Sequence, residues 1–175
     1  FDADASFYQD LLLKRDPVGL ISIERCGINS KNDYANMRGV SIRENTATID
    51  QLFSLAHKKG LPTWGVGDGG NEIGMGNLKD VISKKLSLVP CVNKVDHLVI
   101  ATVSNWGAFG MTAYLEKLTG VHVFPSYENM HKYLEQTVAI GSIDGVNKVH
   151  VCTVDGYPAE VEEEIVNALQ DSLSN

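Results

Sequence analysis

The chain has 175 residues, of which 43% are hydrophobic and 21% are charged, and its formal net charge is −7. Such a composition is typical of a globular protein with a sizeable core and argues against a disordered chain. The acidic balance, without a basic stripe, argues against nucleic acid as the main partner. No apolar run approaches the roughly 20 residues that a bilayer-spanning helix needs, so we expect no membrane association.

Three cysteines, Cys26, Cys91 and Cys152, are scattered along the sequence and form no C-x-x-C pair. This pattern argues against a disulfide framework or a zinc site and favours a reducing compartment. We therefore expect an intracellular protein, in the cytoplasm or, in a eukaryote, in the mitochondrial matrix. No signal peptide is recognisable in the sequence, which opens on Phe1 rather than on methionine.

Apolar periodicity and capping residues predict the secondary structure in chain order. Ser6 and Ser126 are candidate N-caps, and Gly60, Gly120 and Gly141 are candidate helix stops. The predicted helices cover residues 6–14, 46–59, 77–85, 105–118, 126–140 and 159–173. The predicted strands cover residues 18–23, 61–66 and 95–103, with 121–124 and 147–154 as further candidates.

Strands that alternate with helices predict an α/β fold. We expect an open, mostly parallel sheet of about four to five strands with helices on both faces, in a Rossmann-like three-layer arrangement. Residues 1–175 are expected to form a single domain of this kind. The carboxyl ends of parallel strands lie at one edge of the sheet. The polar pairs that follow the first three strands are therefore expected to converge on one cleft; they are Glu24-Arg25, Gly67-Asp68 and Ser104-Asn105.

A glycine-rich loop at residues 65–77 lies between a predicted strand and a predicted helix, and six of its thirteen residues are glycine. Glycine lets other groups approach the backbone closely, and α/β proteins hold ligands at such junctions. Asp68 and Glu72 are the candidate catalytic residues, because a carboxylate here can act as acid or base or bind a divalent cation. The alternative is that Asp68 holds its own loop and Glu72 caps the next helix. No cofactor is required.

Residues 34–39 form a polar loop that contains Tyr34, Asn36 and Arg38. Arg38, like Arg25, is able to clamp a carboxylate with two hydrogen bonds, and the alternative for both is a surface ion pair with a neighbouring glutamate. Tyr34 and Asn36 either orient a substrate or tie the loop down.

Ser104, Asn105 and Trp106 begin a predicted helix, where N–H groups and side chains are able to receive an anion. The alternative is ordinary helix capping with Trp106 in the core. The histidines show no metal-ligand spacing, and Cys26 has no evident base partner in the sequence, so we expect these residues to be structural.

The glycine loop also resembles the metal-binding Gly-Asp-Gly-x-Asn-Asp loop of haloacid-dehalogenase-type phosphatases. Asp2-Ala3-Asp4 imitates the nucleophile pair of that family. Their pair follows a buried apolar strand, whereas only Phe1 precedes it here. A metal-dependent phosphatase is therefore kept as an alternative function.

Five segments together resemble the carboxyl-terminal domain of the D-glutamate cyclase family, in its latter part. They appear in the order of the family and span nearly the whole chain: IERCG (23–27), YANMRG (34–39), GVGDGGNEIGMGN (65–77), VSNWG (103–107) and VDGYP (154–158). Cys26 stands where the family is expected to have proline. The domain of the family is longer at its amino end, so this chain is similar to a part of it or to a short member.

The resemblance implies a hydro-lyase that interconverts D-glutamate and 5-oxo-D-proline with loss of water. Asp68 is then expected to be the base toward the amine, Glu72 the proton donor to the leaving oxygen, and Arg38 the clamp for the α-carboxylate. Backbone N–H groups near Gly69, Gly70 and Asn105 are expected to face the oxyanion. The remaining residues of the expected substrate-binding set are Glu24, Arg25, Tyr34, Asn36, Asn71, Ser104 and Trp106.

The expected partner is a small-molecule substrate, and the sequence leaves a homo-oligomer open. A second alternative is an amino-acid-binding module that keeps these loops but has no turnover, because the chain lacks the upstream part of the domain.

Overall fold

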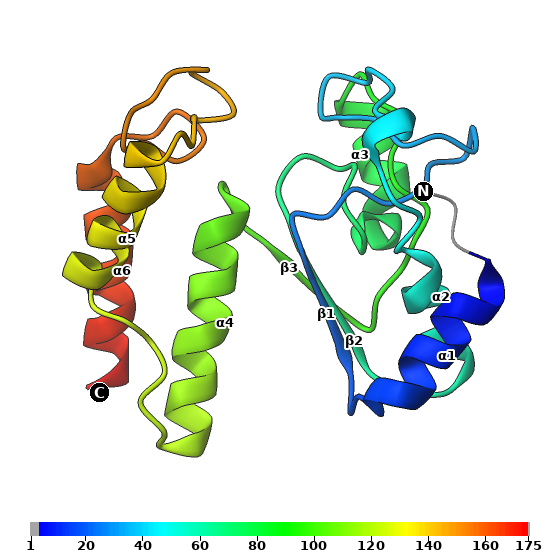
Figure 1. Cartoon of the computed structure of the whole chain (residues 1–175), viewed down its shortest axis with the longest axis horizontal. Helices are drawn as coiled ribbons and strands as arrows, with labels where there is room; N and C mark the ends of the chain where they lie inside the picture. The colour runs from blue at the N-terminus through cyan, green and yellow to red at the C-terminus, as the bar shows by residue number, and fades with distance from the viewer. Residues whose placement is uncertain (1–3, 175) are drawn as a thin grey trace. The chain divides into compact units, whose positions relative to one another are not determined.

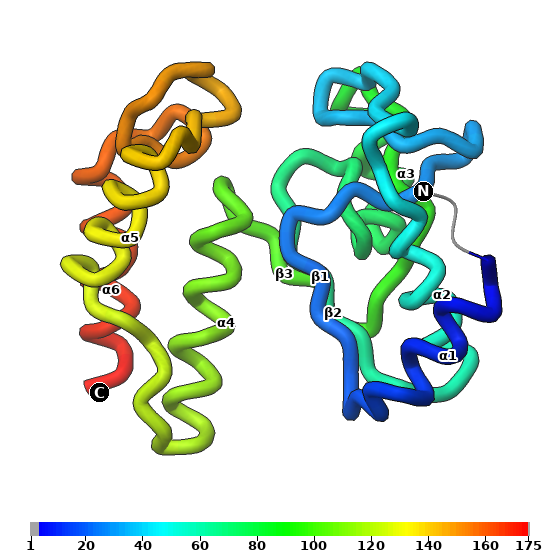
Figure 2. The backbone as a smooth tube through the Cα atoms, viewed as in Figure 1, coloured from blue at the N-terminus to red at the C-terminus, as the bar shows by residue number. Residues whose placement is uncertain are grey.

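The structure is a computed structural model that describes residues 4–174. The chain divides into two compact units, of which the first ends at Ser104 and the second begins at Asn105 (Figures 1 and 2). The expectation of a single domain over residues 1–175 stays a prediction. Among the described residues, no helix has both the length and the apolar character that a membrane crossing requires.

The first unit is built on a parallel sheet in the order β1-β2-β3, in which Ile23 pairs with Val66 and Gly67 with Ile100. Its described elements are α1 (Ala5–Arg15), β1 (Leu20–Ile23), η1 (Arg43–Asn45), α2 (Gln51–Lys58), β2 (Thr63–Gly67), η2 (Met75–Leu78), α3 (Lys79–Lys85) and β3 (His97–Ile100). The predicted parallel α/β class is confirmed. The predicted count of four to five strands is wrong, because the sheet formed by the described residues has three.

Helices α1 and α2 pack together over the sheet, as Figure 1 shows. Their shared core is a cluster of buried apolar side chains, against which Leu20 of β1 and Leu98 of β3 pack: Tyr8, Leu12, Leu52, Phe53, Ile73 and Val95. Burial of such side chains contributes about 1.5–3 kcal/mol each to folding. This core fixes the strands whose carboxyl ends carry the candidate site. Helices on both faces of the sheet stay a prediction.

Two predicted helix starts in the first unit differ from the structure. The N-cap of α1 is Asp4, not Ser6, because the Asp4 carboxylate accepts from the N–H of Ser6 at 3.3 Å. Helix α2 begins at Gln51 rather than at residue 46. The residues before it are held by tyrosines instead: the Tyr8 hydroxyl lies 2.7 Å from Thr48 Oγ1, and the Tyr34 hydroxyl donates to Asp50.

The second unit contains the helices α4 (Ser104–Thr119), α5 (Tyr127–Ala139) and α6 (Ala159–Leu173), of which α4 begins at the last residue of the first unit. Ala113, Phe124 and Val166 form its buried centre. The predicted N-cap Ser126 is confirmed, since its side chain accepts from the N–H of Asn129. The predicted stop after α4 is also confirmed, because Gly120 has a φ of 68°.

The predicted strands at residues 121–124 and 147–154 are wrong, because carboxylates take the N–H groups that a sheet would use. Glu116 accepts from the N–H of Val123 and of Phe124, both at 2.8 Å, and from His122. These bonds, led by that from His122, lower the pKa of Glu116 to about 2. Asp144 accepts from the N–H of three residues and from the Thr153 hydroxyl; the three are Val146, Asn147 and Gly156.

The glycine loop after β2 folds around one side chain, that of the buried Glu72. Its Oε1 accepts from the N–H of Asp68 at 3.2 Å and of Gly69 at 2.7 Å, and its Oε2 accepts from the N–H of Gly70 at 2.7 Å. Gly70 has a φ of 99°, which a residue with a side chain rarely adopts. The loop is therefore closed on itself by three charge-assisted hydrogen bonds.

Replacement of Asp144 by Asn should destabilise the second unit in a pH-dependent way. Burial opposes ionisation of Asp144, but hydrogen bonds from Thr153 and from backbone N–H groups prevail and lower its pKa to about 2. Since an unfolded Asp has a pKa of about 3.9, this stabilisation is present above about pH 4 and is lost as the pH falls toward 2.

The measurement is urea unfolding from pH 7 to pH 2, followed by Trp106 fluorescence in a Trp64→Phe background. The difference between wild type and Asp144→Asn should be largest near neutral pH and shrink below about pH 4. Glu163→Gln, a change at an exposed position of α6, is the control. A difference that stays constant with pH contradicts the assignment.

Replacement of Glu72 by Gln should destabilise the first unit by about 1.5–3 kcal/mol, because one amide oxygen cannot accept from three N–H groups and the amide NH₂ faces a donor. Urea unfolding followed by Trp64 fluorescence in a Trp106→Phe background measures the change. Glu44→Gln, at an exposed position of the same unit, should have little effect. Equal stability of the two variants would show that Glu72 does not hold the loop.

Candidate active site

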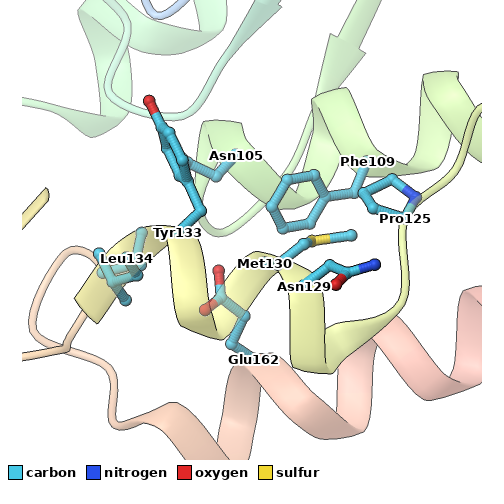
Figure 3. A pocket seen from close by; sticks show the side chains of 9 residues that line it. Asn105, Phe109, Pro125, Asn129, Met130, Tyr133, Leu134 and Glu162 are labelled. Atoms are coloured by element: carbon cyan, nitrogen blue, oxygen red, sulfur yellow. The ribbon is translucent and has the colours of Figure 1, made fainter. Parts of the chain in front are cut away.

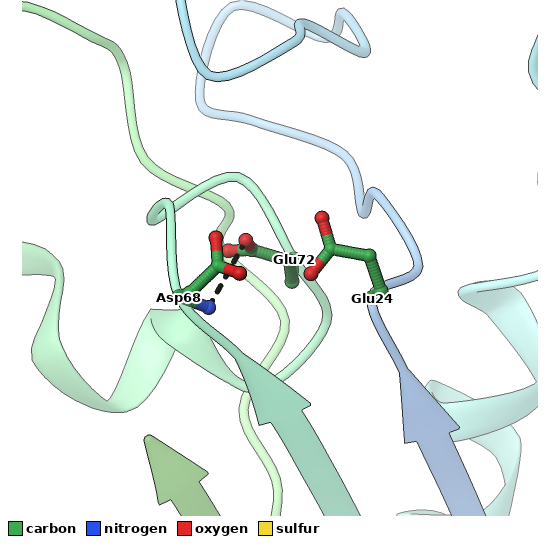
Figure 4. A group of neighbouring side chains, drawn as sticks. All are labelled: Glu24, Asp68 and Glu72. Carbon is green, nitrogen blue, oxygen red and sulfur yellow. Dashed lines mark hydrogen bonds between the residues drawn. The ribbon is translucent and has the colours of Figure 1, made fainter. Parts of the chain in front are cut away.

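The candidate site lies at the carboxyl edge of the sheet, where Glu24 follows β1 and Asp68 follows β2 (Figure 4). Two backbone hydrogen bonds draw the glycine loop against the segment after β1: Ile73 N–H donates to Arg25 O at 2.8 Å, and Gly27 N–H donates to Asn71 O at 3.0 Å. As a result, one carboxylate oxygen each of Glu24, Asp68 and Glu72 lies within 4.8 Å of the others.

Asp68 is held between two segments. Its backbone N–H donates to Glu72, and its Oδ2 accepts from the N–H of Ser104 at 3.0 Å. Ser104 is buried, so its position at the end of the first unit fixes one oxygen of Asp68. The Asp68 side chain is half-buried and reaches the pocket beside the loop.

That pocket has a volume of about 300 Å³, at the lower end of the range for small-molecule sites. Asp68 and Gly69 of the glycine loop line it together with Met37 and Arg38 of the 34–39 loop. The structure thus brings a carboxylate and a guanidinium to one pocket, as the sequence predicted for Arg38 and Asp68. The rest of the wall is formed by Leu86, Ser87 and Leu88, after α3. The sequence did not predict these three residues as part of the site, because they contain no glycine, charge or recognisable motif.

Two residues that were predicted to bind substrate have structural hydrogen bonds instead; they are Tyr34 and Asn36. Tyr34 is 1% exposed, and its hydroxyl donates to Asp50 at 2.5 Å. Burial, followed by this hydrogen bond and the Asp50 charge, raises the pKa of Tyr34. The Asn36 Oδ1 accepts from the N–H of Arg38 at 2.9 Å and of Val40 at 3.1 Å. Asn36 therefore shapes the turn that presents Arg38.

Four more of the predicted residues have structural partners, namely Arg25, Gly69, Gly70 and Asn71. The Arg25 guanidinium donates to Ala47 O at 2.9 Å. The N–H groups of Gly69 and Gly70, which were expected to face an oxyanion, both donate to Glu72. Burial raises the pKa of the Cys26 thiol, and the neighbouring Asn71 side chain lowers it by less.

Asn105 and Trp106 lie in the second unit. Asn105 is exposed and lines a pocket of that unit. The Trp106 ring lies 5.0 Å from the Tyr157 ring, and its buried Nε1 has no hydrogen-bond partner in the part of the chain that the structure describes. The predicted convergence of Asn105 with Arg38 and Asp68 stays a prediction.

The three neighbouring carboxylates are able to do two kinds of chemistry. Carboxylates this close repel one another unless a proton or a cation lies among them. Glu24, Asp68 and Glu72 are therefore suited either to proton transfer or to holding a divalent cation through oxygen ligands. Of the nucleophile pair in the phosphatase alternative, Asp2 and Ala3 lie outside the described residues, and Asp4 caps α1.

Two comparisons show which known proteins this chain is similar to. A family model described as "D-glutamate cyclase-like, C-terminal" matches residues 3–170. The human protein "D-glutamate cyclase, mitochondrial" is 38% identical over 112 residues, which are 62% of this chain. The match spans only 18% of the length of the human protein. The family model covers nearly the whole chain, so the predicted family is confirmed. This chain belongs to the D-glutamate cyclase-like family, and the part of the family that it matches is the C-terminal one.

Proposed function

We propose that this chain takes part in the interconversion of D-glutamate and 5-oxo-D-proline with loss of water. The observation that carries the proposal is that Arg38 and Asp68 line one pocket of amino-acid size. The family supports it, since the human relative is named a D-glutamate cyclase. That name also supports a mitochondrial location if the source is a eukaryote.

The chemistry requires a base, an acid and a folded substrate. The substrate ammonium loses a proton, its nitrogen attacks the side-chain carboxyl carbon, a C–N bond forms, and a C–O bond breaks as water leaves. Arg38 would bind the α-carboxylate of the substrate through two parallel N–H···O hydrogen bonds. This contact would help to hold the substrate in the folded conformation that ring closure requires. Asp68 would take the proton from the ammonium, since Ser104 and its own loop fix its position.

We propose that Glu24 gives a proton to the oxygen that leaves as water. Glu72 was the expected donor, but both of its oxygens accept backbone N–H groups, and a proton on it would displace one of these bonds. Glu24 is exposed and lies in the same carboxylate cluster. Glu72 would then act by holding the loop in shape.

The alternative from another class is an amino-acid-binding module without turnover. Such a module would use the same pocket, since the Arg38 guanidinium is able to hold an amino-acid carboxylate whether or not turnover follows. Titration with D-glutamate beside a chiral assay for 5-oxo-D-proline separates binding from turnover. Phosphate release from a generic ester, lost on chelation of divalent ions, would instead support the phosphatase alternative.

Asp68→Asn should lower turnover of D-glutamate by at least about 100-fold, because the amide cannot take the proton of the substrate ammonium. The amide oxygen still accepts from Ser104 N–H, so the fold should be retained. Chiral chromatography of 5-oxo-D-proline measures the effect, and circular dichroism checks the fold. A folded variant with near-normal turnover would refute the role of Asp68 as base.

Arg38→Lys should raise KM for D-glutamate about 10- to 100-fold and change kcat less, since lysine keeps the charge but loses the two-bond fork. Steady-state kinetics of the same reaction measure both constants. Arg15→Lys, at an exposed position of α1, is the matched control. An unchanged KM in Arg38→Lys would exclude the carboxylate clamp.

A further inference from the structure

The second unit contains a pocket of its own, with a volume of about 360 Å³ (Figure 3). Its wall is mostly apolar and comes from α4, α5 and α6 and from the segments that connect them. The apolar lining residues that matter for a ligand are Phe109, Pro125, Met130 and Leu134. Asn129 and Tyr133 also line the pocket. A concave apolar pocket with few polar groups is typical of small-molecule sites.

One carboxylate points into this pocket, that of Glu162 on α6 (Figure 3). The residue is only 5% exposed. No hydrogen-bond donor or ion-pair partner meets its carboxylate among residues 4–174. Burial, which outweighs the attraction of His131, raises the pKa of Glu162. Because this carboxylate opens onto the pocket and no group of residues 4–174 donates to it, the site is suited to a ligand that supplies a donor.

His131 lies near Glu162, but its ring nitrogens lie nearer to other groups. Its Nδ1 lies 3.3 Å from the Tyr127 hydroxyl, and its Nε2 lies 3.7 Å from the Glu135 carboxylate. The imidazole therefore does not occupy the donor position in front of Glu162. That position faces the apolar wall formed in part by Phe109 and Met130.

We propose that this pocket binds a primary amine with an apolar body and no carboxylate. The ammonium group pairs with Glu162, and the apolar body lies against Phe109 and Met130. An ammonium supplies three donors to one carboxylate. D-glutamate does not fit, because its two carboxylates would meet Glu162 in an apolar surrounding. Asn105, which was expected to face the oxyanion of D-glutamate, lines this pocket, whereas Arg38 and Asp68 line the other one. The two pockets share no lining residue.

The test is a titration of the 175-residue chain with benzylamine and with benzyl alcohol, which has the same shape but no charge. We expect benzylamine to bind at least about 10-fold more tightly, since its ammonium group forms charge-assisted hydrogen bonds with the carboxylate and the hydroxyl of benzyl alcohol does not carry that charge. In ¹H–¹⁵N spectra the largest shifts should fall on residues of the pocket, such as Asn129 and Met130. Equal affinity of the two ligands, or shifts elsewhere, would overturn the proposal without any variant.

Glu162→Gln should abolish the preference for benzylamine, because the amide carries no charge. Glu164→Gln removes the same charge from an exposed position of the same helix and should leave the preference intact. If both variants bind benzylamine as the wild type does, Glu162 is not the ammonium partner and the proposal fails. Loss of the preference in Glu164→Gln as well would show a long-range charge effect and would also overturn it.

Discussion

The candidate site depends on the Glu72 carboxylate, which accepts three backbone N–H groups of its own loop. A loop rich in glycine has many conformations to lose on folding, so it needs a strong local interaction to hold one of them. Glu72 supplies that interaction from a fully buried position. The same bonds direct Asp68 toward the pocket and bring its carboxylate beside Glu24.

Carboxylates organise the irregular segments of the second unit in the same way. Glu116 holds the backbone of residues 123–124, and Asp144 holds the turn after it and the N–H of Gly156. Each carboxylate satisfies several N–H groups that would otherwise need a sheet or water. Buried and half-buried carboxylates therefore shape loops in both units, whereas the chemical role that we propose belongs to the carboxylates that follow β1 and β2.

The sequence predicted the features that depend on neighbours along the chain. The bounds of α6, the Ser126 cap and the glycine stop after α4 follow from local capping and periodicity. The edge of a parallel sheet, together with the loop motifs, placed Arg38 and Asp68 at one pocket. The strand predictions at 121–124 and 147–154 failed because the Glu116 and Asp144 carboxylates accept hydrogen bonds from these segments. Apolar periodicity contains no information about such bonds. Tyr34 was ambiguous for a similar reason: its partner Asp50 is sixteen residues away.

The most direct test of the account is amide hydrogen exchange at Gly69 and Gly70 in the intact chain. If Glu72 holds the loop, both amides should exchange slowly, as do amides that are hydrogen-bonded in a folded core. The amide of the exposed Gly145 gives the rate of an open loop. Slow exchange at both glycines, lost in Glu72→Gln, is the result that the account predicts. Exchange as fast as that of Gly145 in the wild type would contradict it.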